Sequence, residues 1–180
     1  MKNNLLNMMC LDLYLSSLDK DKSDKALTLV DTPNKNNLNI ISWGVNGLLE
    51  AKDLKTINFL AKKYNWKNNL KTILNTNNYE SLVITDLSKK IVWVNDGFSK
   101  MTGYNKEFAI NKTPSFLHGK ETQDKTRKRI GAKLIKNKPF KDIIINYRKD
   151  NTPYKCELHI FPLFDDQKTT HFIALEREVV

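Results

Sequence analysis

The chain has 180 residues, 40% of them hydrophobic, and its 30 Lys and Arg against 20 Asp and Glu give a formal charge of +10. This length and apolar content predict a soluble globular domain with a substantial extension. The only cysteines, Cys10 and Cys156, lie far apart, which argues against a disulfide framework and favours the cytoplasm. Residues 1–18 lack a clean signal-peptide core, and no stretch approaches the ~20 apolar residues of a membrane span.

Apolar residues follow a helical spacing through the first 75 residues. The pattern covers residues 5–15, is broken by a loop at Asp31–Asn34, and returns over residues 48–61. Its last members are Trp66, Leu70, Ile73 and Leu74. We therefore expect a helical N-terminal extension over residues 1–77.

The period changes to two near residue 79. Residues 82–86 and 91–94 are short β-branched runs, which predict a hairpin. Asn95 or Asp96 is placed to cap a short helix, and Gly103 is placed to end it in the left-handed region.

Two further helices are expected next. Thr113-Pro114 is a helix-start signature, because Thr accepts a hydrogen bond at the cap and Pro tolerates the first helical position. A longer basic helix is predicted from about Thr122 to Lys136. Its cations favour a solvated face over a nucleic-acid patch; they are Lys125, Arg127, Lys128, Arg129, Lys133, Lys136 and Lys138.

Three strands complete the pattern, at about 140–148, 154–163 and 170–179, with turns at Asp150-Asn151 and at 165–168. The order β-β-α-α-α-β-β-β predicts an α+β fold. We expect an antiparallel sheet with helices on one face.

Three segments carry a family resemblance: residues 111–119 (NKTPSFLHG), 146–150 (NYRKD) and 171–177 (HFIALER). In order and spacing they resemble the signature segments of LOV domains, the light-sensing branch of the PAS family. There the first segment reads Gly-X-Asn-Cys-Arg-Phe-Leu-Gln-Gly, and its cysteine forms the light-driven bond to the flavin. Pro114 stands at the cysteine position and has no nucleophile. The resemblance implies a PAS fold, with a five-stranded sheet, over residues 78–180, and a site that cannot form this adduct.

The resemblance also implies a ligand pocket. Strand alternation and the family pattern predict which strand residues line this pocket. They are Val83, Thr85, Asn146, Cys156, Leu158, Phe172, Ala174 and Glu176. The helical segment would add Thr113, Pro114, Ser115, Leu117 and His118. Lys128 aligns with a residue that clamps the flavin phosphate in this family.

Of seven positions diagnostic of LOV flavin sites, only Asn146 keeps the family residue. The six departures are Thr113, Pro114, Ser115, His118, Cys156 and Glu176. Each lost amide removes hydrogen bonds of ~0.5–1.5 kcal/mol apiece, so several together would erase a nanomolar site. The resemblance therefore implies FMN as the cofactor, whereas these six residues argue against it. The identity of the ligand stays open.

Glu176 is the departure with the clearest physical consequence. A carboxylate on an inward apolar face is costly unless it is neutralised or paired. In an open pocket it would stay protonated or meet a cation such as a ligand amine. The alternative is a collapsed pocket in which Glu176 reaches solvent or a lysine.

The remaining polar candidates have simpler explanations. His118 has no second metal ligand at a suitable spacing, which favours hydrogen bonding at a helix end and no metal site. His159 and His171 are expected at the surface or at a sheet edge. Cys156 is either a small buried hydrophobe or a relocated reactive thiol, and the first is the commoner case.

No catalytic motif is present in the sequence, so we expect a non-enzymatic sensory or interaction module in signal transduction. Its sheet would pack on flanking helices or on a second subunit through Leu70, Ile73 and Leu74. Its partners would be a small molecule and either a second copy or a signalling protein. Two alternatives stay open: a flavin photoreceptor that works without the cysteine, and a basic regulator that binds nucleic acid through residues 125–138.

Overall fold

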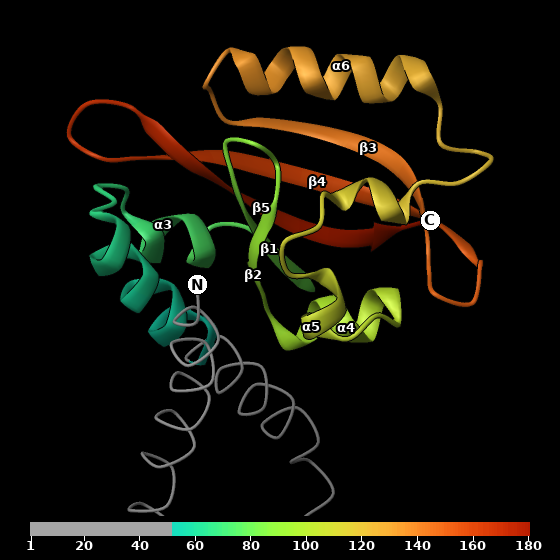
Figure 1. Ribbon diagram of the computed structural model, residues 1–180, viewed down its shortest axis with the longest axis horizontal. Helices are drawn as coiled ribbons and strands as arrows, with labels where there is room; N and C mark the ends of the chain where they lie inside the picture. The colour runs from blue at the N-terminus through green and yellow to red at the C-terminus, as the bar shows by residue number, and fades with distance from the viewer. Residues whose placement is uncertain (1–51) are drawn as a thin grey trace, which may run out of the picture. The chain divides into compact units, whose positions relative to one another are not determined.

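The computed structural model describes residues 52–180 (Figure 1). The helical pattern expected at residues 5–15 and the loop at Asp31–Asn34 lie outside this range. Of the predicted N-terminal extension, the described part contains a helical segment at residues 52–64 and α3 (Leu70–Asn75). No helix within residues 52–180 is long and apolar enough to cross a membrane.

A five-stranded antiparallel sheet forms the centre of the fold, as predicted. Its order is β2-β1-β5-β4-β3, so the last strand in the sequence lies at the middle of the sheet. The strands are β1 (Ser81–Asp86), β2 (Ile91–Val94), β3 (Phe140–Tyr147), β4 (Pro153–Phe164) and β5 (Thr169–Val179).

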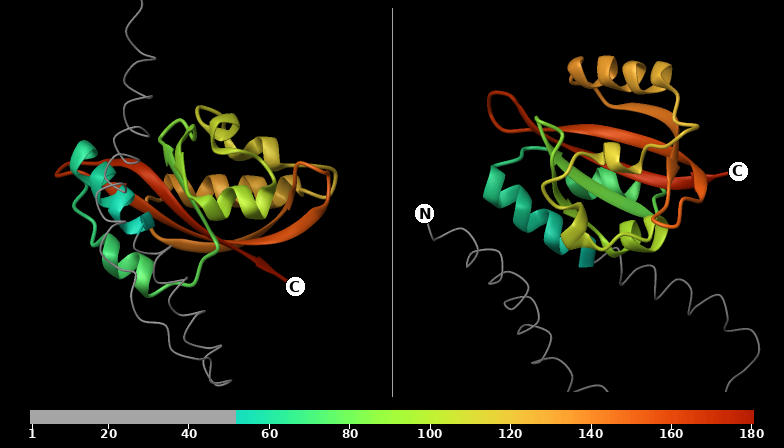
Figure 2. Two further views of the ribbon diagram at one scale, coloured as in Figure 1. Left: turned by 90° about the horizontal axis from the view of Figure 1, so that it is seen from below. Right: turned by 45° about the vertical axis from the view of Figure 1, so that its right-hand side comes forward.

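Four helical elements connect β2 to β3 and pack toward one face of the sheet (Figure 2). They are α4 (Asp96–Thr102), α5 (Lys106–Ala109), the 3-10 helix η1 (Pro114–Leu117) and α6 (Asp124–Ile135). The four-residue α5 was not predicted, because one helical turn is too short to show a hydrophobic period.

The ends of α4 confirm the capping signals in the sequence. The Asn95 side chain accepts the Phe98 N–H at 3.0 Å and the Leu82 N–H at 2.9 Å, so it also ties the helix to β1. Gly103 ends the helix with φ +76°, a left-handed conformation that favours glycine.

Thr113 occupies the N-cap position of η1, as predicted, but the hydrogen bond expected of it there is absent. Its side chain makes no capping bond, and its hydroxyl lies 2.5 Å from the Ser115 hydroxyl. The two short hydroxyl side chains satisfy each other locally, which competes with capping. Pro114 does occupy the first turn, as expected, although that turn is 3-10.

Asp142 on β3 fastens α6 to the sheet. It accepts from Arg129 Nε and Lys133 Nζ, each at 2.9 Å, and from the backbone N–H of Ile143 at 2.9 Å. Its side chain is only 5% exposed. This pairing fixes the helix above the inner face of β3.

The outer face of the sheet is covered by the helices of residues 52–64 and 70–75, which we call the helix cap together with the segment that joins them (Figure 2). Its buried side chains pack on outward residues of β1, β4 and β5. On the cap side the cluster contains Ile57, Leu60, Trp66, Leu70 and Leu74, and on the sheet side it contains Leu82, Ile84, Leu163, Ile173 and Leu175. Leu70 and Leu74 are thus buried within the chain, and Ile73 is half-buried against them.

His171 joins the cap to β5, which corrects its predicted place at the surface. It is 8% exposed, and its Nδ1 accepts from Trp66 Nε1 at 3.3 Å. The Tyr64 ring lies 4.2 Å from the imidazole, centroid to centroid. Strand alternation separates His171 from its cavity-facing neighbour Phe172, but the sequence pattern does not reveal that the outer face is covered.

Candidate functional site

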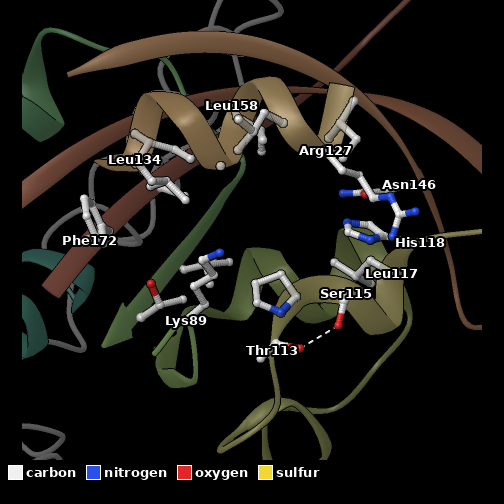
Figure 3. Close-up of a pocket in the computed structure, with 18 of the residues that line it drawn as sticks. Lys89, Thr113, Ser115, Leu117, His118, Arg127, Leu134, Asn146, Leu158 and Phe172 are labelled. Carbon is white, nitrogen blue, oxygen red and sulfur yellow. Dashed lines mark hydrogen bonds between the residues drawn. The ribbon is translucent and has the colours of Figure 1, made fainter. Parts of the chain in front are cut away.

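A cavity of ≈ 380 Å³ lies between the inner face of the sheet and the elements η1 and α6 (Figure 3). Small-molecule sites occupy roughly 300–1,000 Å³. The volume therefore suits a compact organic ligand.

Alternate residues of four strands form one wall, because successive side chains point to opposite faces of a sheet. Strands β1 and β3 contribute two residues each, β4 two and β5 three. These residues are Val83, Thr85, Ile144, Asn146, Leu158, Ile160, Phe172, Ala174 and Glu176. Most are apolar, so this wall of the cavity is hydrophobic and has few polar groups.

The opposite wall comes from the helical segments. Around η1 it is formed by Thr113, Pro114, Ser115, Leu117 and His118. From α6 it receives Arg127, Ile130, Gly131 and Leu134, whose spacing of three and four residues defines one helix face. All pocket residues predicted from the sequence line this cavity except Lys128 and Cys156.

Lys128 is the first correction. It is exposed, and the neighbouring Arg127 lines the cavity instead. One residue turns a helix by about 100°, so the side chains of Arg127 and Lys128 leave α6 in different directions. The i, i+3, i+4, i+7 pattern of Arg127, Ile130, Gly131 and Leu134 was the signal that would have found the correct face.

Cys156 is the second correction. It shares the inner face but is fully buried in a cluster with Tyr154 and Ile144, beside the cavity wall. Burial raises the pKa of the Cys156 thiol far above its usual range. It therefore behaves as a small hydrophobe, and Cys156 is the only free cysteine among residues 52–180.

Glu176 is buried at the cavity wall and is 6% exposed. Its Oε2 accepts from the hydroxyl of Ser81, the facing residue on β1, at 3.0 Å. Burial raises the pKa of Glu176 to about 7, and the bond from Ser81 opposes that rise only in part. The structure therefore contradicts the alternative of a collapsed pocket in which Glu176 reaches solvent.

Asn146, His118 and Arg127 gather at one corner of the cavity (Figure 3). Asn146 Oδ1 and His118 Nδ1 are buried, and neither has a hydrogen-bond partner among the described residues. Burial, with a smaller contribution from the Arg127 charge, lowers the pKa of His118, which keeps the ring neutral. No cluster of three or more metal-ligating side chains occurs within residues 52–180.

Lys89 also lines the cavity, from the turn between β1 and β2, and sequence reasoning missed it. In Figure 3 it lies well away from the corner that contains Arg127, His118 and Asn146. Its φ of +66° places it in the left-handed region, and its N–H donates to the Asp86 carbonyl at 3.0 Å. Nothing in a strand-alternation pattern locates such a turn residue.

The profile of the PAS domain family matches residues 80–179. This covers all five strands and the whole cavity wall.

Curated relatives of this region include a photoreceptor and a regulatory protein. The blue-light photoreceptor of Listeria monocytogenes is 34% identical over 101 residues, which is 54% of this chain and 40% of the relative. A nitrogen fixation regulatory protein of Klebsiella oxytoca is 25% identical over 100 residues, 55% of this chain and 20% of the relative. The chain thus spans less than half the length of these curated relatives.

Solved structures agree with the profile. The LOV domain of a blue-light activated histidine kinase from Erythrobacter litoralis superposes with a TM-score of 0.52 at 28% identity, over 55% of this chain and 94% of that domain. The LOV domain of the photoreceptor aureochrome1 in its light state gives a TM-score of 0.55 at 25% identity, over 61% and 88% of the two chains.

Proposed function

Because this chain belongs to the PAS domain family, and its relatives are sensory proteins, we propose that it is a non-enzymatic sensor that converts occupancy of its cavity into a change at the helix cap. The predicted boundary between extension and domain near residue 78 stays a prediction. So does the cytoplasmic location.

One observation carries this proposal: the cavity and the helix cap share the same strands. Val83 lines the cavity, whereas its neighbours Leu82 and Ile84 are buried under the cap. On β5, Ala174 faces the cavity and Leu175 faces the cap. A guest that moves the inner side chains must therefore shift strands on which the cap rests, and such packed interfaces change between discrete arrangements.

The same cavity supports a sensor that works without a cysteinyl adduct. Pro114 lines the wall, and Cys156, the only free cysteine of the described residues, does not. Light as the signal is suggested by the names of the photoreceptor relatives. It would then have to act through flavin reduction or another chromophore.

Photochemistry separates these two sensors. The protein is purified, reconstituted with FMN and illuminated with blue light, and the blue absorption band is followed. We expect no bleaching that recovers in the dark. Pro114→Cys is the matched variant, because it restores a thiol at the family position. Reversible bleaching of the unmodified protein that needs no electron donor and recovers without oxygen would contradict the adduct-free proposal. Stable binding of FMN with bleaching that needs an electron donor and recovers only with oxygen is light-driven reduction, and it would favour the photoreceptor alternative.

The ion pairs of α6 favour a solvated helix face over a nucleic-acid patch. Arg129 and Lys133 both bind Asp142, and Arg127 pairs with Asp124. Three of the seven predicted cations are thereby paired within the chain, with two carboxylates. We propose that the partner is a protein, either a second copy or a signalling protein. Duplex binding that weakens steeply with salt would contradict this.

Native mass spectrometry of freshly purified protein tests whether the cavity has a natural guest. We expect a fraction of the protein to carry one extra small molecule that is released on denaturation. The bare chain mass alone, in repeated preparations, would count against a ligand sensor.

A further inference from the structure

The polar atoms inside the cavity face a ligand as acceptors. Glu176 and Asn146 are 6% and 5% exposed, and both lie in the wall. Glu176 accepts one hydrogen bond, from Ser81, and Asn146 Oδ1 accepts none from the described residues. Buried polar atoms are nearly always hydrogen-bonded, so these acceptors are available to donors of a guest or of water.

Within the described chain no cation compensates Glu176. None of the ion pairs formed by residues 52–180 includes it. The two cations of the cavity wall are Lys89 and Arg127. Arg127 is paired with Asp124 and lies at the corner of Asn146 and His118, and Lys89 comes from the turn beyond β1.

From this geometry we infer that the cavity selects an organic cation, an ammonium or amidinium group on an apolar body, with Glu176 as its counter-ion. The inference rests on the proposed ligand sensor and specifies the chemical class of its guest. The apolar wall would hold the body, and the N–H donors would meet Glu176, with Asn146 as a further acceptor.

The physical reason is the cost of a lone buried carboxylate. Without a partner it must stay protonated or suffer the desolvation of its charge, and a cation in contact removes that penalty. A neutral guest leaves Glu176 uncompensated, and an anionic guest adds repulsion. The formal charge of +10 on the chain acts in the opposite direction at long range, because it repels cations and attracts anions. A preference for the cation would therefore have to arise inside the cavity.

Two indoles of opposite charge test this directly. Tryptamine carries an ammonium group and indole-3-propionate a carboxylate on the same ring system. Each is titrated calorimetrically at pH 8 into the full chain, into Glu176→Gln and into Glu107→Gln. Glu107 is exposed on α5 and does not line the cavity, so its variant matches the charge change.

We expect tryptamine to bind at least tenfold more tightly than indole-3-propionate. Glu176→Gln should remove that preference and Glu107→Gln should keep it. Equal or tighter binding of indole-3-propionate, no effect of Glu176→Gln, or no binding of either indole would overturn the inference.

The molecule retained in native mass spectrometry distinguishes this inference from the proposed function. A retained anion or neutral compound would leave the sensor standing and overturn the cation selectivity. An empty chain that binds neither indole would count against both.

Discussion

At the scale of single residues, Pro114 and Glu176 set this cavity apart from the LOV signature that the chain otherwise resembles. Pro114 removes the nucleophile and has a local structural reason, because it occupies the first turn of η1. Glu176 has no such reason, since a carboxylate on the inner face costs stability. An unfavourable buried group retained at a cavity wall is typical of a functional site.

Replacement of Glu176 by glutamine should stabilise the protein in a manner that depends on pH. The folded state holds the pKa of Glu176 at about 7, above the ordinary value near 4.3. The folded state therefore binds a proton that the unfolded chain releases, and stability is lost as pH rises through that interval. Glu176→Gln should be more stable than the parent by up to about 3 kcal/mol at pH 8 and nearly equal at pH 4.

Chemical denaturation at both pH values measures this difference, with Glu107→Gln as the exposed control. A stabilisation that is the same at pH 4 and pH 8 would show that the Glu176 carboxyl is not the titrating group.

At the scale of elements, the ion pairs of Asp142 hold α6 over the cavity. Arg129 and Lys133 hold the pKa of Asp142 far below its usual range, and hydrogen bonds from Arg129 contribute most. Asp142→Asn should cost about 1 to 2 kcal/mol at pH 7, toward the low end because solvent screens the half-exposed Arg129. The contribution is present above about pH 4 and is lost as pH falls further.

Unfolding of Asp142→Asn and its parent at pH 7 and at pH 3 checks this prediction. Asp124→Asn is the control, because it removes the same charge at an exposed position in the first turn of α6. A cost of Asp142→Asn that does not shrink at pH 3 would contradict the ionic origin.

The helix cap gives a second prediction at this scale. Leu74 is 6% exposed against the outer face of the sheet, so an aspartate there would bury an unpaired charge. Leu74→Asp should destabilise the chain by about 4 kcal/mol or more, measured by denaturation. Lys71→Asp, on the exposed side of α3, should have little effect. A folded Leu74→Asp of unchanged stability but altered subunit count would instead place Leu74 at a contact between chains.

Much of this fold was predictable because its local signals agree. The β-branched runs, Asn95 and Gly103 located the hairpin and α4 without knowledge of tertiary contacts. Strand alternation groups Val83, Asn146 and Glu176 with the residues on one face of each strand, and the family resemblance implied that these faces line the pocket. The predictions were wrong where the rotation of a helix or a contact between distant residues decides whether a side chain is buried or lines the cavity. The choice between Arg127 and Lys128 depends on helix phase, and the burial of His171 depends on a cap packed from distant residues.

At the scale of the whole molecule, the account depends on transmission through one sheet. The cavity lies on the inner face and the helix cap on the outer face, and β1, β4 and β5 belong to both. Binding or release of a guest therefore acts on the same strands on which the helix cap packs. The +10 charge, in contrast, is spread over the chain and predicts only general effects on solubility and association.

Filling the cavity from within tests this transmission. Gly131 lines the cavity from α6, and a Cβ built there meets no atom within 4 Å, so Gly131→Leu adds a side chain without a clash at Cβ. Removal of a mid-helix glycine also favours the helix by up to about 1 kcal/mol. Ala132→Leu, the adjacent exposed residue, is the matched control.

Amide hydrogen exchange of residues 52–75 in Gly131→Leu, in Ala132→Leu and in the parent is the most direct measurement. We predict that Gly131→Leu changes protection in the helix cap as well as in the strands, and that Ala132→Leu leaves the cap as in the parent. Altered exchange in the strands with an unchanged cap in Gly131→Leu would contradict the coupling of cavity and cap.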